Sequence, residues 1–233
     1  MKTKSLFPLL LLSVLISACS SSVDYSESFK KETSGKYLFN ADDIMIISYE
    51  DNQLYIKWRG LKTKPVVTDT NEFFVPDLYK KLRFVVHPDT KERYIAVIAE
   101  NNPDSLSYDY LKVSDNYKTP SQYLDDKDFD NALVGFLKIK EKDSMSDFIN
   151  QYKFNRLGYR YLRENNFDDA IGVFIMNTKL HPISDNVYDS LADAYVKSGD
   201  SLKGYENYKN AYELNNGNRR AKKYIDAYEG SRP

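Results

Sequence analysis

Cysteine, histidine and tryptophan are nearly absent from this chain, whose 233 residues contain one cysteine, two histidines and one tryptophan. A single cysteine excludes an internal disulfide, so we expect the fold to be held by packing alone. The histidines, His87 and His181, each precede a proline in a probable turn, and two histidines without cysteine partners make no plausible zinc site. The sequence therefore predicts neither disulfides nor a metal centre.

Catalytic and nucleotide-binding signatures are also missing. The patterns G-x-S-x-G, G-x-x-x-x-G-K-[ST] and H-E-x-x-H do not occur. Ser28–Lys31 fits S-x-x-K, and Tyr208–Asn210 mimics a companion motif, but the first falls in a presumed tether and the second in a repeat helix. The acidic run Asp125–Asp128 lacks the spacing and the glycine of a calcium loop. We therefore predict that the chain is not an enzyme and binds no cofactor.

Charge of one sign does not dominate, and only one long apolar run exists. The formal net charge is −1, and no basic stripe is present, so nucleic acid is not an expected partner. Hydrophobic residues at 42% and charged residues at 29% are ordinary globular values. After the N-terminal apolar run no second one follows, so no further membrane-spanning segment is predicted.

That apolar run has the form of a signal peptide. Lys2 and Lys4 give a short positive start, and residues 6–16 are almost wholly apolar. The run is too short to span a bilayer, which needs about 20 apolar residues. Removing Lys2 and Lys4 from the 33 basic residues leaves 31 against 34 acidic ones, so the mature chain would carry −3.

The run ends in Ile16-Ser17-Ala18-Cys19, the pattern read by the bacterial lipoprotein-processing machinery. Residues 1–18 are therefore predicted to be a lipoprotein signal peptide, and Cys19, the only cysteine, to carry the lipid that anchors the chain to a membrane. Ser20, in place of an aspartate, resembles the default sorting signal for the outer membrane. We expect a membrane-anchored lipoprotein of the bacterial envelope, with residues 19–34 as its lipidated, polar tether.

Residues 35–115 carry the pattern of antiparallel strands. Residues 54–58 alternate apolar and polar side chains, which predicts a sheet with one buried and one solvated face. Turn residues at Asp51-Asn52 and at His87–Lys91 each indicate a hairpin. We expect a small antiparallel sheet or open barrel of roughly six to eight strands.

Beyond Thr119-Pro120 the pattern becomes helical, which makes the predicted fold class α+β. Residues 120–148 are expected to be a connecting helical segment, and residues 149–230 a helical repeat domain of two repeats and a capping helix. Large and small side chains recur there at the 34-residue period of the tetratricopeptide repeat. The first copy is Phe154, Leu157, Gly158, Tyr161, Ala170, Phe174 and Pro182, and the second is Tyr188, Leu191, Ala192, Tyr195, Gly204, Tyr208 and Asn216.

Three stretches within these repeats, 154–159, 169–174 and 186–195, extend the likeness. They resemble the C-terminal extension of exported β-lactamase-like serine hydrolases of Bacteroidota. Gly35–Tyr37 and the hairpin at 51–54 resemble, more weakly, the small β domain that precedes such an extension. The resemblance covers residues 35–228 and includes no catalytic domain. It therefore implies an accessory module without the chemistry.

In tetratricopeptide repeats the first helix of each pair lines a concave groove, so the resemblance implies a groove for a protein or peptide partner. We expect it to take an extended segment that is basic in its middle and acidic at one end. Two alternatives remain open: a β domain that binds an apolar ligand, unless Trp58, Phe84 and Ile95 fill it, and a degenerate relative of a hydrolase. The implied groove residues are Tyr152, Asn155, Tyr159, Arg163, Asn186, Asp189, Asp193, Lys197, Arg220 and Lys223.

Overall fold

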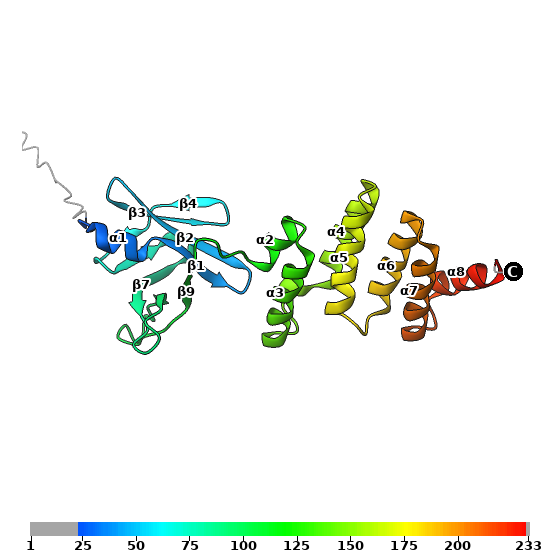
Figure 1. Ribbon diagram of the computed structural model, residues 1–233. Coiled ribbons are helices and arrows are strands. Elements are labelled where there is room, and N and C mark those ends of the chain that lie inside the picture. The colour runs from blue at the N-terminus through cyan, green and yellow to red at the C-terminus, as the bar shows by residue number, and fades with distance from the viewer. Residues whose placement is uncertain (1–22, 232–233) are drawn as a thin grey trace, which may run out of the picture.

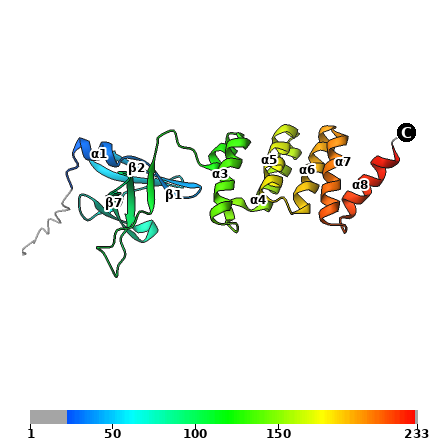
Figure 2. The ribbon, with the colours of Figure 1, turned by 60° about the horizontal axis from the view of Figure 1, so that its bottom comes forward.

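Residues 23–231 are described here from a computed structural model of the chain (Figure 1). A curled antiparallel sheet forms one end of an elongated molecule, and helices follow it in a row toward the C-terminus (Figures 1 and 2). The predicted α+β class is confirmed. The predicted signal peptide and Cys19 lie outside the described residues. Among the helices of residues 23–231, none combines the length and apolar character needed to cross a membrane.

Nine strands form one antiparallel sheet in the order β4-β3-β2-β1-β9-β8-β7-β6-β5. The count exceeds the expected six to eight because Lys64-Pro65 divides one expected strand, and a proline has no N–H to donate to a ladder. The strands are β1 (Gly35–Asn40), β2 (Asp43–Glu50), β3 (Gln53–Trp58), β4 (Leu61–Thr63), β5 (Val66–Val67), β6 (Glu72–Val75), β7 (Lys80–Val86), β8 (Arg93–Val97) and β9 (Tyr110–Val113).

The two edges of the sheet, β4 and β5, are joined by only the two residues of that interruption. Three chain steps span at most about 11 Å, so the edges must lie close together. The sheet therefore curls into a half-barrel. Its concave side is filled by side chains that are almost completely buried: Tyr37, Met45, Ile47, Leu54, Ile56, Phe73, Leu82 and Ile95.

This filling counts against an apolar ligand inside the barrel. Ile95 is fully buried, and the Phe84 ring packs on the same core, 5.0 Å from the Phe73 ring. Trp58 does not fill the interior as expected. It lies half-buried, with its ring 4.7 Å from that of Phe39, and its Nε1 donates to the Asp43 carboxylate at 3.0 Å.

The expected tether instead contains a helix that packs on the half-barrel. Helix α1 (Glu27–Thr33) follows Tyr25, whose side chain is only 4% exposed and lies 5.0 Å from the Tyr49 ring. The Phe29 ring lies 5.9 Å from that of Phe84, and the Thr33 and Tyr49 hydroxyls are 2.7 Å apart. The prediction of a tether over residues 19–34 is therefore wrong from Tyr25 onward. Two aromatic residues are too few to show periodicity, and only the tertiary contact reveals their burial.

Ser28 accordingly lies in the first turn of a helix and not in a tether. Its side chain and that of Lys31 are exposed, and the Ser28 hydroxyl lies 3.2 Å from that of Ser26. The S-x-x-K pattern was expected in a tether, and this expectation was wrong. Its Ser28 and Lys31 side chains lie on the exposed surface of α1.

Residues 120–230 form a tetratricopeptide-like array of helical hairpins (Figure 2). The first helices of successive pairs begin at 151, 185 and 219, and the second helices at 167 and 201, so both recur every 34 residues. The helices are α2 (Pro120–Asp125), α3 (Phe129–Lys142), α4 (Gln151–Arg163), α5 (Phe167–Leu180), α6 (Asp185–Ser198), α7 (Ser201–Leu214) and α8 (Arg219–Gly230).

One turn geometry closes three of these pairs: α2/α3, α4/α5 and α6/α7. In each, a residue with positive φ precedes a helix N-cap with φ of −85°, and the N-cap N–H donates to a tyrosine carbonyl at 2.9 Å. The turns are Lys127-Asp128 with Tyr123, Asn165-Asn166 with Tyr161, and Gly199-Asp200 with Tyr195.

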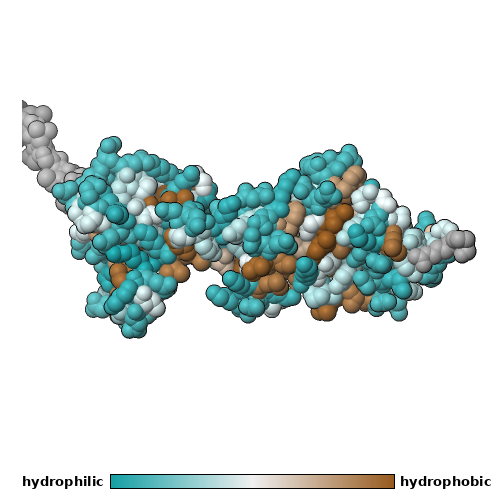
Figure 3. All heavy atoms as spheres, viewed as in Figure 1, coloured by the Kyte–Doolittle hydropathy of each residue, from teal (hydrophilic) through white to brown (hydrophobic). Residues whose placement is uncertain are grey.

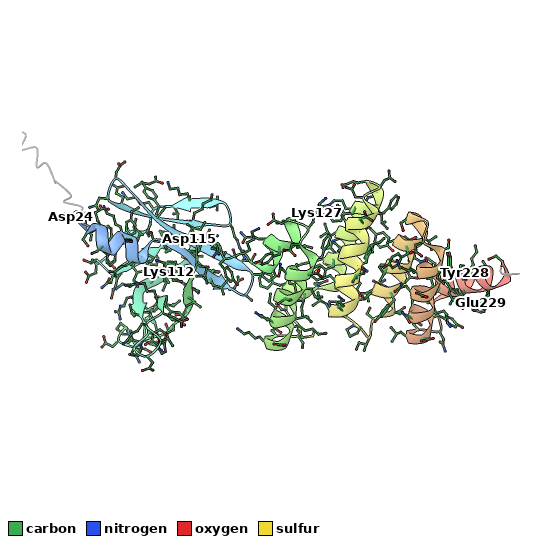
Figure 4. All side chains as sticks on the ribbon, viewed as in Figure 1. Asp24, Lys112, Asp115, Lys127, Tyr228 and Glu229 are labelled. Carbon is green, nitrogen blue, oxygen red and sulfur yellow. The ribbon has the colours of Figure 1, made fainter. Side chains whose placement is uncertain are left out.

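Residues 120–148 are helical as expected, but they form an additional hairpin, the first of the array, and are not merely a connector. The loop between α3 and α4 runs over residues 143–150, whereas the equivalent loop after α5 runs over 181–184. The longer loop shifts the period and hides the repeat in the sequence. Phe136 of α3 and Phe154 of α4 share one core, with ring centroids 5.2 Å apart. Lys127, labelled in Figure 4 between the first two hairpins, pairs with Asp169 of α5.

The two helices of a hairpin can pack closely only where one of them carries a small residue, as the repeat spacing predicted. A Cβ on Gly158 of α4 would lie 2.5 Å from the Phe174 ring of α5. Phe174 is fully buried and Leu191 is 5% exposed, which confirms their predicted place in the seam. Leu157 was expected to be buried there too, but it is only partly buried, at the edge of the core.

Helix α8 ends the array. Asp226 lies one 34-residue period after Ala192 and two periods after Gly158, the small residues at this position in the earlier repeats. Its carboxylate pairs with Lys222 at 2.9 Å, and both side chains are more than half exposed. A charged, solvated side chain at this position is typical of a terminal repeat.

Candidate functional site

A cleft of about 580 Å³ lies on the first helices of two neighbouring hairpins, α4 and α6. Five of the six residues that line it were implied by the repeat register. Arg156 was not predicted, although it lies one turn after Tyr152 and two turns before Arg163 on the edge of the same helix face. The lining residues are Tyr152, Asn155, Arg156, Tyr159, Arg163 and Asn186.

Two tyrosines give the cleft its apolar surface. Tyr152 stands at the start of α4 with 58% of its surface exposed. Tyr159, two turns further along, is half-buried, with its ring 5.3 Å from the Phe174 ring in an edge-on arrangement. Tyr159 is therefore held in place by the core, while Tyr152 is free to contact a partner.

Asn155 is part of a network of amides and is not available to a ligand. It is 8% exposed, its Nδ2 donates to the Asn186 side chain, and its Oδ1 accepts from Asn177 at 2.9 Å. The Asn177 Nδ2 also donates to the Gln151 carbonyl at 3.1 Å. These bonds join α4, α5 and α6, so Asn155 fixes the geometry of the cleft.

The acidic residues of the predicted groove are already neutralised. Arg220 reaches from α8 to the Asp189 carboxylate on α6, and its guanidinium lies 3.4 Å from the Tyr159 hydroxyl on α4. Asp193 pairs with Lys197 at 3.2 Å and lies 3.9 Å from Arg220. The expected basic middle of the bound segment needed free carboxylates in the groove, and the pairing of Asp189 and Asp193 contradicts that expectation.

Arg220 also covers the Tyr208 ring, with its Cζ 5.8 Å from the ring centroid. Burial raises the pKa of Tyr208 to about 12. The side chain of Arg220 thus ties three first helices together, and it contributes to the shape of the groove more than to its free charge.

Three cationic side chains that line the cleft or belong to the predicted groove are exposed: Arg156, Arg163 and Lys223. Within residues 23–231 none of them takes part in an ion pair. Because the acids are paired and these cations are not, the free charge of the groove is positive. Such a surface is complementary to an acidic segment.

No set of three or more histidine, cysteine, aspartate or glutamate side chains in the described part of the chain is arranged to hold a metal ion. The viewed face of the molecule is largely hydrophilic, with separate hydrophobic patches on the helical half (Figure 3).

No protein-family model and no curated protein matches this chain. Solved structures resemble its helical part. The first TPR of Spaghetti (RPAP3), bound to the HSP90 peptide SRMEEVD, is 16% identical, with a TM-score of 0.34 over 48% of this chain and 86% of its own. A MamA R50E mutant is 20% identical, with a TM-score of 0.36 over 48% and 79%.

Another MamA structure is 23% identical, with a TM-score of 0.33 over 48% of this chain and 63% of its own. At such TM-scores these likenesses carry no weight for function. The description of the helices as a tetratricopeptide-like array rests on their 34-residue recurrence and their shared turn.

Proposed function

We propose that this protein is a non-catalytic interaction module that holds an extended segment of another protein in the groove of its helical repeats. The observation that carries this proposal is the cleft on α4 and α6, with an exposed tyrosine beside two unpaired arginines. Tyrosine and arginine are the residues that most often dominate binding energy at protein interfaces.

The shape of the site supports an extended ligand. Tyr152, Tyr159 and Arg163 lie along one face of α4, over 12 residues and a rise of about 17 Å. The Asn155 network and the Arg220 contacts hold the neighbouring helices in place. Binding therefore costs little conformational entropy in the protein. The unpaired arginines favour acidic side chains in the bound segment, and affinity should fall as salt rises.

Anchoring to a membrane through lipid on Cys19 is part of the same proposal. The pattern at residues 16–19 supports it, and Ser20 supports an outer-membrane location. Metabolic labelling with palmitate should mark the protein, and Cys19→Ala should abolish the label. An unlabelled wild-type protein recovered in the soluble fraction would contradict the anchor without affecting the groove.

A relation to the extensions of exported serine hydrolases is a further part of the proposal, supported by residues 154–159, 169–174 and 186–195. In that case the chain acts as an accessory module. Purified protein should not hydrolyse nitrocefin or short acyl esters. Turnover that Ser28→Ala removed would show that the S-x-x-K pattern had been dismissed wrongly.

Site-specific photo-cross-linking tests the groove. A benzoylphenylalanine at Tyr152 should form a discrete adduct with a partner in intact cells, whereas the same group at Lys209, exposed on α7, should not. Arg156→Glu combined with Arg163→Glu should remove the adduct, and Lys209→Glu should leave it. A third variant carries the cross-linking group in place of Tyr55 on β3. Adducts that form only with this variant would show that the half-barrel binds the partner instead.

A further inference from the structure

A second cleft, of about 480 Å³, lies between the half-barrel and the first hairpin. Leu38 of β1 and Ala41 of the following turn form one wall. Pro120 of α2 and Val134 and Ile139 of α3 form the other. Its volume is in the range of sites that hold small ligands, which often lie between domains. This cleft is separate from the groove on α4 and α6.

The wall formed by α3 differs from the equivalent wall of the next hairpin. When the common turn is used to align them, Val134 corresponds to Gly172, which receives Phe129 of the preceding hairpin. Lys138 corresponds to Met176 and Lys142 to Leu180, both of which are buried. Within residues 23–231 no hairpin of the array precedes α2/α3, and the same positions are open to the cleft.

The exposed positions combine an apolar surface with positive charge. Val134 is 53% exposed, although it lines the cleft. Three lysines line the cleft and no acidic residue does. Lys118 is paired with Asp126 at 2.7 Å, but Lys138 and Lys142 have no ion-pair partner within residues 23–231. They are one helical turn apart, about 6 Å along α3, so both ammonium groups can reach one anion.

We propose that this cleft binds a small amphipathic anion, an apolar body that carries one carboxylate. The body lies between Val134 and Leu38, and the carboxylate lies between Lys138 and Lys142. The free lysines explain the preference for an anion, and the exposed valine explains the need for an apolar part. If this face of α3 only capped the array against solvent, exposed lysines would be expected on it. An exposed valine beside them would not be expected.

Octanoate is the probe, and 1-octanol is its uncharged counterpart. In a ¹H–¹⁵N NMR titration of the full chain, octanoate should give saturable shifts at Leu38, Val134 and Lys138. Octanol should bind more weakly. Lys138→Gln combined with Lys142→Gln should weaken octanoate binding about fivefold, which corresponds to about 1 kcal/mol for the two exposed charge contacts together.

The matched control is Lys57→Gln combined with Lys64→Gln, two exposed lysines of the half-barrel that do not line the cleft. It should leave the affinity unchanged. Val134→Asp, at an exposed position that should not affect folding, should abolish binding. The proposal is overturned if octanoate and octanol bind equally, if the lysine double variant binds like the wild type, or if no shift saturates at the cleft. It also fails if a pentaglutamate peptide binds there while octanoate does not, because the occupant would then be a protein segment.

Discussion

The carboxylate of Asp42, in the turn between β1 and β2, accepts the backbone N–H of Ser121 at 2.8 Å. The Ser121 hydroxyl donates to the same carboxylate. Ser121 lies in the first turn of α2, so these bonds join the half-barrel to the helical array. Burial raises the pKa of Asp42, and the hydrogen bonds from Ser121 and Thr119 limit the rise.

A pH dependence follows from this pair. Since the pKa of Asp42 is higher in the folded chain than in the unfolded one, the folded chain binds the proton more readily. The contribution of Asp42 to the free energy of unfolding therefore falls as pH rises from about 4, the ordinary aspartate value, through the raised value. Asp42→Asn keeps an acceptor but does not titrate.

Urea unfolding of the two proteins across this window should show the variant gaining stability relative to the wild type as pH rises. Asp77→Asn, at an exposed position in the β6–β7 connection, is the control for removing one carboxylate. A constant difference between wild type and Asp42→Asn at all pH values would contradict the prediction.

Gly158→Ala should destabilise the array. The new methyl group would meet the Phe174 ring at 2.5 Å, and overpacking of this kind costs about 1–3 kcal/mol. That loss exceeds the gain of up to about 1 kcal/mol from the higher helix propensity of alanine. Thermal unfolding measures the effect. Gly230→Ala, where nothing lies within 4 Å of the added methyl, should be neutral or slightly stabilising.

The first hairpin, α2/α3, should be energetically coupled to the second, α4/α5. Phe136 is 1% exposed and Phe154 is 3% exposed, and their rings meet edge to face. Each change to alanine should cost about 3–5 kcal/mol. In a double-mutant cycle the two losses should differ from additivity by about 0.5–1.5 kcal/mol. Strict additivity would indicate that α2 and α3 fold independently of the repeats that follow.

Arg220 and Asp189 should also behave as a pair. The Asp189 side chain is 13% exposed and that of Arg220 is 47% exposed, so solvent screens the pair only in part. Arg220→Ala and Asp189→Ala should each lower the free energy of unfolding by about 1 kcal/mol, and the double variant by less than the sum. Lys222→Ala, whose pair on α8 is more exposed, is the comparison and should have a smaller effect. Equal effects of all three single changes would contradict the prediction.

The amino-acid sequence by itself determined the features that depend on local pattern. The alternation at residues 54–58 indicated a sheet, and the 34-residue recurrence located α4 to α8 and the role of Gly158. These signals are readable because a helix or strand repeats its contacts every few residues, and because a tight seam needs a small residue at a fixed place.

Tertiary structure alone decided the rest. The burial of Tyr25, the neutralisation of Asp189 by Arg220 and the meeting of Asp42 with Ser121 join residues that are between 24 and 79 positions apart. The first hairpin, α2/α3, was hidden because a longer loop at residues 143–150 shifted the period, although its turn geometry is the same as that of the hairpins that follow. Contacts between distant segments depend on how complete elements pack, and no local periodicity encodes that packing.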